Sequence, residues 1–335
     1  MKRLKIIIAV VMAIGILAAC GCSVKEPGTD SAVGDQAIVS SIVHGSPSGV
    51  WFMLSTALAE SLGNTYKGSV LHATPGNQTA NIFRIDRYES EFALTHSNIA
   101  FAAMNGTWEY DEKISNIGGI AVFYPSVLQF AMRKQLGVGT FDEFIENKIP
   151  LKFAIGADGG IQQLVLIAVL REYGLTLEDL EGWGCKLHRV GSSESVELFS
   201  DGVIDGIWIP ASAPNPSIMQ MATNAEMSMV TLSSEIIERV IENAGYSHQD
   251  IPADSYGFVT ESIPSVCGYT ILCASLQTSD ETAYKMARAI NENIDYIKSV
   301  HSSMGGITSD KLIENIKIPL HPGAEKYYRE IGLMD

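Results

Sequence analysis

Short apolar runs alternate along the chain with segments whose hydrophobic residues recur at helical spacing. Residues 37–43 (AIVSSIV) have the composition of a β-strand, and a break rich in Gly, Ser and Pro follows at residues 44–49. From Val50 to Leu62, apolar side chains then repeat every three or four positions. That spacing places them on one face of a helix. The pattern therefore predicts a strand, a turn and a helix in direct succession.

The same order of strand, turn and helix is predicted three more times. The predicted strands cover residues 68–73, 151–155 and 186–190, and the helices that follow them cover 78–88, 161–173 and a segment ending at Ser200. Each intervening turn is rich in Gly, Ser, Asn or Asp. Such alternation is typical of an α/β protein with a largely parallel sheet.

Two further strand-like runs, residues 124–133 and 265–275, flank the middle of the chain. A chain that leaves one lobe along one strand and returns along another joins two lobes by two connections, which form a hinge. The amphipathic stretch 280–299 is predicted to be one long helix that packs on the first lobe. We therefore predict a first lobe from residues 37–125 and 270–335, and a second lobe from residues 126–269.

The N-terminal residues have the features of an export signal. Residues 1–5 are basic and residues 6–19 carry no charge. As a helix this uncharged stretch would span about 21 Å, short of the roughly 30 Å hydrocarbon core, so residues 1–19 are predicted to be a signal peptide. The stretch ends in Leu-Ala-Ala-Cys20, which resembles the lipobox of bacterial lipoproteins. Cys20 is then the expected lipidation site, with Cys22 as the weaker candidate.

A lipidated Cys20 would hold the protein on the outer face of the bacterial cell membrane. The next residues, up to position 36, are small, polar and Pro/Gly-containing, as in a flexible tether. The predicted location is therefore extracytoplasmic, with the membrane surface contacted through the lipid anchor. The alternative is an ordinary secreted protein with a stray cysteine.

Composition narrows the class of protein and of partner. The chain has 335 residues, of which 46% are hydrophobic, and 23 Lys and Arg stand against 38 Asp and Glu, a formal net charge of −15. The apolar fraction excludes a disordered chain. The acidic balance excludes nucleic acid as a partner, because such affinity depends on Lys and Arg at the phosphates.

The cysteines and histidines do not form a recognisable chemical motif. Cys267 and Cys273 are six residues apart in a strand-like run, about 20 Å if extended, which is beyond disulfide reach. We expect buried thiols, no metal site and no cofactor. There is no HExxH, no Gly-x-Ser-x-Gly, no Walker loop and no Gly-x-Gly-x-x-Gly, and the seven histidines are scattered. We therefore predict that the protein is not an enzyme, although distant residues can assemble a triad, so a lipid-anchored surface hydrolase is an alternative.

The four predicted turns share a physical property. A helix start leaves four backbone N–H groups without internal partners and carries partial positive charge. Several such starts at the carboxyl ends of parallel strands form a pocket for an anionic or strongly polar small ligand. The alternative is that these turns are ordinary N-caps that bind nothing.

Particular segments resemble a known family. The closing segment 318–332 (IPLHPGAEKYYREIG) is similar to the characteristic C-terminus of the TAXI family, the extracytoplasmic solute receptors of TRAP-type secondary transporters. Tyr124-Pro125 resembles the family's Tyr-Pro at the first crossing between lobes, and residues 202–206 resemble its Gly-x-Ile-Asp-Ala run. Residues 74–77 (TPGN) resemble its Thr-Gly-Gly-Ser, and residues 93–97 (ALTHS) its strand ending in Gln-Ser-Asp.

The resemblance implies a fold and a function. The expected fold is α/β, the two-lobed type II periplasmic-binding-protein kind, with two crossover strands forming the hinge. The implied function is capture of a small anionic or zwitterionic solute, an amino acid such as glutamate or glutamine or an organic acid, for a TRAP-type membrane permease. A sensor that reports to a membrane kinase is an alternative. A monomer is expected, since a hinge needs freedom.

Ligand-binding residues follow by position from the resemblance. From the first lobe they are Gly45, Ser46, Trp51, Thr74, Gly76, Asn77, Thr95, Ser97 and, at the hinge, Tyr124. From the second lobe they are Asp158, Gly159, Gly160, Ile161, Gln162, Ala211 and Ser212.

Several of these residues have alternative interpretations. Asp158 either caps a helix in solvent or points inward, where its charge would repel a carboxylate and favour an ammonium group. An α-amino acid offers both groups. Trp51 and Trp208 either contact the ligand or, as is more frequent for tryptophan, belong to the core. Residues 219–229, which contain four methionines, are predicted to be core and turn, and the segment at His321 is predicted to be structural.

Overall fold

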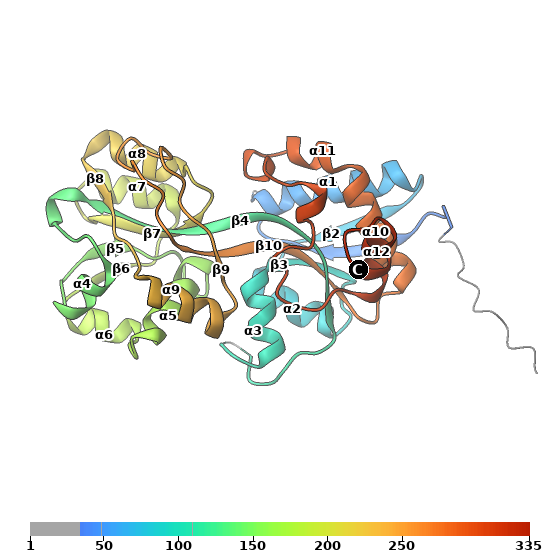
Figure 1. Ribbon diagram of the computed structural model, residues 1–335, viewed down its shortest axis with the longest axis horizontal. Helices are drawn as coiled ribbons and strands as arrows, with labels where there is room; N and C mark the ends of the chain where they lie inside the picture. Colours follow the sequence, from blue (N-terminus) through green and yellow to red (C-terminus); the bar gives the residue numbers. More distant parts are fainter. Residues whose placement is uncertain (1–33, 48, 109) are drawn as a thin grey trace, which may run out of the picture. The chain divides into compact units, whose positions relative to one another are not determined.

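The computed structural model describes residues 34–47, 49–108 and 110–335 (Figure 1). Residues 35–335 form one compact unit. The predicted signal peptide, the expected lipidation site Cys20 and nearly all of the predicted tether lie outside the described residues. Within the described part, no helix has the length and apolar character needed to cross a bilayer.

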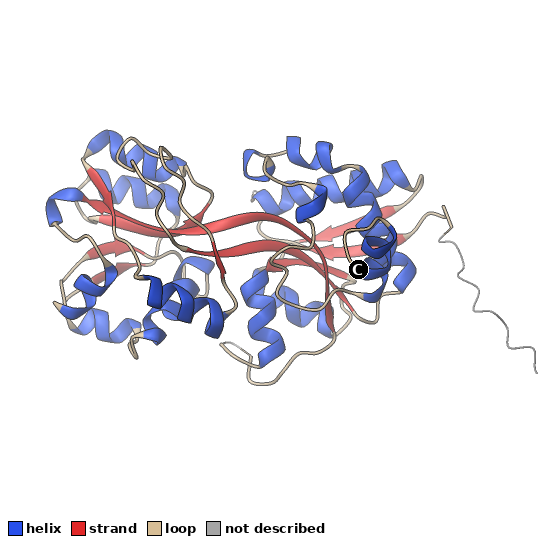
Figure 2. Cartoon of the chain, viewed as in Figure 1, coloured by secondary structure: helices blue, strands red, loops and turns tan. Residues whose placement is uncertain are grey.

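Strands of one mixed sheet form the centre of the unit, with helices on both faces (Figure 2). The strand order is β2-β1-β3-β10-β4-β7-β5-β6, with β8 paired to β4 and β9 to β10. The strands are β1 (Val39–Val43), β2 (Val70–Thr74), β3 (Phe92–His96), β4 (Ile117–Arg133), β5 (Lys152–Ala154), β6 (Lys186–His188), β7 (Gly206–Ala211), β8 (Met227–Met229), β9 (Ser247–His248) and β10 (Val266–Ser275).

Helices connect most of these strands. They are α1 (Val50–Thr65), α2 (Gln78–Asp86), α3 (Ser97–Asn105), α4 (Phe141–Glu146), α5 (Ile161–Glu172), α6 (Leu177–Gly182), α7 (Ser192–Ser200), α8 (Pro216–Asn224), α9 (Ser234–Ala244), α10 (Asp280–Glu292), α11 (Ile294–Ser299) and α12 (Pro322–Glu330). Short 3-10 helices cover Lys134–Leu136, Ser302–Met304 and Ser309–Lys311. All four predicted strand–turn–helix units are present, with ends shifted by a few residues.

Two groups of parallel strands are joined by the long strands β4 and β10. Strand β1 runs parallel to β2 and β3, and β5 runs parallel to β6 and β7. Strand β10 is antiparallel to β3 and β4, and β4 is antiparallel to β7. Figure 1 shows the green β4 beside the orange β10. The predicted α/β fold with two crossover strands is confirmed.

Two predicted elements differ from those observed. Strand β4 begins at Ile117, seven residues before the predicted start at Tyr124. The predicted long helix 280–299 is two helices, α10 and α11, with a break at Asn293. The Nδ2 of Asn293 donates to Ala289 O at 2.9 Å and to Thr65 Oγ1 at 2.9 Å. This side chain binds the end of α10 and the neighbouring helix α1, so the backbone turns there rather than continuing.

Buried side chains explain several residues that the sequence left open. Trp208 is fully buried in an aromatic cluster, with its ring centroid 5.3 Å from that of Phe130. The cysteines of the described part are buried free thiols at positions 185, 267 and 273. His321 is buried and caps α12 by accepting a hydrogen bond from Gly323 N at 3.2 Å. The interpretations of Trp208 as core and of His321 as structural are therefore confirmed.

The methionine-containing segment is divided between core and surface. Met221, Met227 and Met229 are buried, whereas Met219 is 51% exposed. In the described residues, no group of three or more His, Cys, Asp or Glu side chains is placed to hold a metal ion. The predicted core position holds for three of the four methionines, and the segment consists of the end of α8 and of β8 with a short connection between them.

Candidate functional site

A cavity of about 420 Å³ lies where the parallel strands β1, β2 and β3 end. Its lining comes from the starts of α1 and α2, from the last residue of β3 and from β4. The lining residues are Gly45, Ser46, Gly49, Val50, Trp51, Gly76, Asn77, Gln78, His96 and Tyr124. We call this cavity the strand-end pocket. Among the described residues that line it, none is Asp, Glu, Lys or Arg.

Helix starts border the strand-end pocket. Helix α1 begins after Gly49 and α3 after His96, and neither start has a side-chain cap. Helix α2 begins after Asn77, whose Oδ1 accepts from Ala80 N at 2.9 Å. The starts of α4, α6, α8, α10 and α12 all have side-chain caps, whereas those of α5, α7, α9 and α11 have none. An uncapped start is thus common among these helices. The start of α1 differs because it lies at a cavity, where a bound anion can accept hydrogen bonds from its free N–H groups.

Aromatic side chains connect the pocket to the two long strands. The Nε1 of Trp51 donates to Thr270 Oγ1 on β10 at 3.2 Å. Tyr124 lies on β4 and is 8% exposed. Burial raises the pKa of Tyr124, and hydrogen bonding with Thr270 and Trp51 offsets part of that rise. One wall of the pocket is thus built on the strands that join the two halves of the sheet.

His96 is a buried polar residue among those that line the pocket. It is 7% exposed, and its ring centroid lies 5.0 Å from that of Trp51. Its Nδ1 atom is buried and has no hydrogen-bond partner within the described structure. Burial lowers the pKa of His96 from 6.5 to about 4, so the imidazole is neutral near pH 7.

Six residues predicted from the sequence line the strand-end pocket: Gly45, Ser46, Trp51, Gly76, Asn77 and Tyr124. The other first-lobe candidates lie outside the lining. Thr74 is exposed at the end of β2. Thr95 and Ser97 are fully buried, where Thr95 Oγ1 donates to Gln78 O at 3.0 Å and Ser97 Oγ accepts from Tyr269 N at 3.1 Å. Both side chains therefore support the backbone around the pocket.

His96, Gln78, Gly49 and Val50 also line the pocket, and the sequence reasoning missed them. For His96 a signal existed. Successive strand residues point to opposite faces of a sheet, so a residue between the two candidates Thr95 and Ser97 faces the other way. The alternation of side chains thus identifies His96 once one knows which face of β3 lies toward the cavity.

The second-lobe candidates lie outside the lining of the strand-end pocket. The carboxylate of Asp158 accepts hydrogen bonds from Arg189 Nε at 2.9 Å and from Gln163 Nε2 at 2.7 Å. Its side chain is 74% exposed. Arg189 also binds Glu181 at 3.1 Å. Asp158 is therefore engaged in a surface ion pair formed by residues of the second half of the sheet.

The turn that holds Asp158 contacts the pocket through its backbone. Gly159 O accepts a hydrogen bond from Gln78 Nε2 at 3.2 Å. The next residue, Gly160, precedes α5 without a side-chain cap. Ile161 packs against the core cluster around β1 and β3. The side chain of Gln78 thus joins the strand-end pocket to the start of α5.

The remaining predicted residues are held by other backbone groups. Gln162 Nε2 donates to Trp208 O at 3.3 Å, and Trp208 Nε1 donates to Gln162 O at 3.1 Å. Ala211 O accepts from Gln129 Nε2 at 3.2 Å, and Ser212 follows the end of β7 in a half-buried position. These contacts fix the carboxyl end of β7 beside the start of α5.

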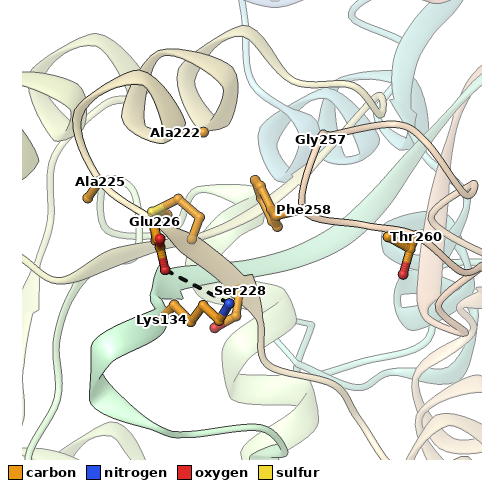
Figure 3. A pocket seen from close by; sticks show the side chains of 9 residues that line it. Lys134, Ala222, Ala225, Glu226, Ser228, Gly257, Phe258 and Thr260 are labelled. Atoms are coloured by element: carbon orange, nitrogen blue, oxygen red, sulfur yellow. Dashed lines mark ion pairs between the residues drawn. The ribbon is translucent and has the colours of Figure 1, made fainter.

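Two other cavities lie away from the helix starts. The larger, about 540 Å³, is an open hollow beside β8 and the end of α8, where Lys134 Nζ lies 3.9 Å from Glu226 Oε2 (Figure 3). Both side chains of this pair are well exposed. A third cavity, about 310 Å³, is lined by Phe123 and Pro125 of β4 and by Tyr269 of β10. Neither contains the start of an α-helix among its lining residues.

The fold and the pocket define a class of protein. Two parallel strand groups joined by two long antiparallel strands, with a pocket at the strand ends, make a type II periplasmic-binding-protein fold. The chain is similar to MatC from Rhodopseudomonas palustris, solved with bound malate, at 13% identity and a TM-score of 0.50 over 88% of this chain and 96% of that one. It is also similar to a protein from Bordetella bronchiseptica RB50, at 14% identity and a TM-score of 0.50 over 89% and 98%.

A further solved structure, the periplasmic binding protein BugD, is similar at 12% identity and a TM-score of 0.49 over 90% of this chain and 99% of that one. The chain belongs to the NMT1-like family, whose model matches residues 42–332. This match confirms the predicted relationship to TAXI-type receptors. The family is one of extracytoplasmic solute-binding proteins for transport, and not of enzymes.

Proposed function

We propose that the protein captures a small carboxylate-bearing solute in the strand-end pocket and delivers it to a TRAP-type membrane transporter. The single observation that supports this most is the start of α1 at Gly49, which has no capping side chain and lines a cavity whose described lining residues are all uncharged at neutral pH. A carboxylate in that position would accept hydrogen bonds from backbone N–H groups. Such bonds to a charged acceptor contribute about 1.5–3 kcal/mol each.

Closure of two lobes around the solute is the second part of the proposal. We assign the first lobe to residues 37–125 and 270–335, and the second to residues 126–269. The hydrogen bond from Gln78 to Gly159 joins these two parts beside the pocket. Gly159, Gly160 and the start of α5 would then complete the site from the second lobe. A bound solute favours the closed form only by as much as it contacts that form better than the open one.

Delivery to a membrane partner requires that the receptor stays at the membrane. We propose lipidation at Cys20, with residues 20–36 as the tether between the anchor and the folded unit. Basic segments can attach a protein to anionic lipids, but this chain is acidic overall, with a formal net charge of −15. We therefore propose the lipid on Cys20 as the attachment to the membrane. Mass spectrometry of the mature protein would show the diacylglyceryl mass on Cys20, and an unmodified N-terminus would contradict the anchor.

The role of the α1 start in solute binding is tested by placing a carboxylate on the protein itself. In Gly49→Asp, the new side chain occupies the position from which a solute carboxylate would accept N–H groups of α1. The new Cβ would lie 3.0 Å from Ser46 Oγ, an exposed side chain that can rotate away. We expect solute affinity, measured by calorimetry, to fall at least tenfold, with little change in melting temperature.

Gly191→Asp is the matched control for this variant. Gly191 precedes α7, which also starts without a side-chain cap, and no heavy atom lies within 4 Å of a Cβ added there. Gly191 does not line the strand-end pocket. Its substitution is expected to leave affinity unchanged. Equal affinity in both variants would contradict the assignment of the solute to the start of α1.

A further inference from the structure

The acceptor groups around the strand-end pocket determine whether it can bind a solute with an ammonium group. An α-amino acid brings an ammonium group, which is costly to bury unless an acidic or several carbonyl oxygens receive it. No Asp or Glu stands among the described lining residues. Asp158, the acidic residue of the turn that contacts Gln78 through Gly159, is bound to Arg189 at 2.9 Å. The guanidinium therefore already neutralises the carboxylate that an ammonium would need.

His96 adds a neutral group to the pocket. Its Nδ1 is buried without a partner in the described structure, and His96 is among the residues that line the cavity. An unpaired buried acceptor costs less than an unpaired buried N–H, so the proton is favoured on the other ring nitrogen, Nε2. The imidazole then offers a hydrogen-bond donor to the pocket. Burial lowers the pKa of His96 to about 4, which keeps this donor uncharged above pH 5.

The pocket therefore presents hydrogen-bond donors, and no anionic acceptor stands among its described lining residues. Helix starts supply backbone N–H groups and His96 supplies a neutral ring N–H, whereas Gln78 Nε2 already donates to Gly159 O. Such a set matches oxygen atoms that accept hydrogen bonds and leaves an ammonium group without an anionic partner.

We infer that the strand-end pocket selects carboxylates that lack an ammonium group, and that His96 donates a hydrogen bond to an oxygen of that solute. This inference rests on the proposed function and narrows it to organic acids. Selection arises from the missing acceptor: an amino acid of the same length would have to bury its ammonium unpaired. His96 acts as a specificity-determining residue because its uncharged ring N–H donates a hydrogen bond to an oxygen of the solute.

The test uses pairs of solutes that differ only in the ammonium group. Binding of succinate against aspartate, and of glutarate against glutamate, is measured by calorimetry on the whole described unit, residues 35–335, at pH 7.5. We expect at least one acid to bind ten times or more tightly than its amino partner. An amino acid that binds as tightly as its acid partner would overturn the inference while supporting the proposed function. No binding by any of the four, with a folded protein by circular dichroism, would count against the proposed function itself.

Variants at two positions separate the residue roles. His96→Gln keeps a neutral donor and is expected to keep acid binding within about threefold, whereas His96→Leu removes the donor and should weaken it at least tenfold. Equal affinity in these two variants would contradict the role of His96. Asp158→Asn should leave acid binding unchanged. If an amino acid binds and loses affinity in Asp158→Asn, then Asp158 does receive an ammonium and the inference is wrong.

Discussion

The Nε1 of Trp51 donates a hydrogen bond to Thr270 Oγ1 at 3.2 Å, across a separation of 219 residues in the sequence. Trp51 belongs to the first turn of α1 and lines the strand-end pocket, whereas Thr270 lies in β10. A solute that contacts Trp51 therefore acts on a side chain that is bonded directly to one of the two joining strands. This contact links occupancy of the pocket to the part of the sheet where a hinge is proposed.

A double-mutant cycle measures the strength of this contact. Trp51→Phe and Thr270→Val each remove one partner of the hydrogen bond, and the fully buried Thr270 is replaced by a side chain of the same shape. We expect a coupling free energy of about 1 kcal/mol in chemical denaturation, the usual net value of such a bond. Strict additivity of the two single variants would show that the bond does not contribute.

Buried histidine makes stability depend on pH in a predictable direction. The pKa of His96 is lowered by burial to about 4 from an ordinary 6.5. Between these values the unfolded chain binds a proton that the native protein does not, so unfolding becomes easier as pH falls. The contribution is fully present above pH 6.5 and is lost toward pH 4, with roughly 2–3 kcal/mol gone by pH 4.5.

His96→Gln isolates this effect from other groups. Burial also lowers the pKa of the nearby His44 and of His321, and both act in the same direction. The difference between the parent protein and His96→Gln, measured by denaturation at pH 7.5 and 4.5, removes their contribution. We expect the variant to lose less stability on acidification, and identical losses would contradict the low pKa of His96.

Gln78 is expected to govern how long a solute stays bound. Its side chain lines the pocket and donates to Gly159 O at 3.2 Å. Gln78→Ala removes that bond and should weaken solute affinity about three- to tenfold, mainly through faster dissociation in stopped flow. Gln220→Ala, at an exposed position of α8, is the control for a lost glutamine side chain. An unchanged dissociation rate in Gln78→Ala would show that the bond has no role in retention.

Gly76 is required for packing rather than for access to the pocket. A Cβ at this position would overlap Asn81 Oδ1, 2.1 Å away. Asn81 is fully buried, and its Nδ2 donates to His44 O and Leu94 O, each at 2.8 Å. Gly76→Ala should therefore lower the free energy of unfolding by about 2–4 kcal/mol, since it displaces a buried hydrogen-bonded side chain.

Gly159→Ala provides the comparison for Gly76→Ala. No heavy atom lies within 4 Å of a Cβ added at Gly159, but its φ of +68° is left-handed. The strain of that conformation should cost only about 1 kcal/mol. Thermal unfolding that ranks Gly159→Ala as the more damaging change would contradict the packing argument.

Because a side chain at Gly76 would disturb the buried Asn81, Gly76 is unsuitable for a variant meant to block solute binding alone.

Hydrophobic periodicity was sufficient to predict the four strand–turn–helix units and the two long strands, but not helices α4, α6, α8 and α9. The apolar face predicted for the first helix is the buried face of α1, which includes Leu54, Leu58 and Leu62. The turns on the first-lobe side of the pocket were also predictable, because their composition marks helix starts, whereas Gly45, Gly76 and Asn77 were identified as site residues through the family resemblance. Periodicity did not reveal the break at Asn293, because its cause is a hydrogen bond to Thr65 on another helix.

Contacts between distant residues account for most of what the sequence did not reveal. Asp158 and Arg189 are 31 residues apart, and no spacing rule predicts that they pair. Asp158 faces solvent as one of the two interpretations expected, but it does not cap α5, which begins after Gly160 without a side-chain cap. His96 could not be predicted as a pocket residue from the sequence. Its place in the lining depends on which face of β3 meets the pocket, and the order of strands in the sheet determines that face.

The pairing of Val127 with Cys267 has a consequence for protein engineering. The middle part of the chain begins after Val127 and ends before Cys267. Because these two residues are paired on neighbouring strands, its two ends lie about 5 Å apart. Two crossover points, one at Val127 and one at Cys267, would suffice to replace the residues between them with those of a relative that binds a different solute. The junctions of such a chimera would fall within hydrogen-bonded backbone, where register is already set by the host.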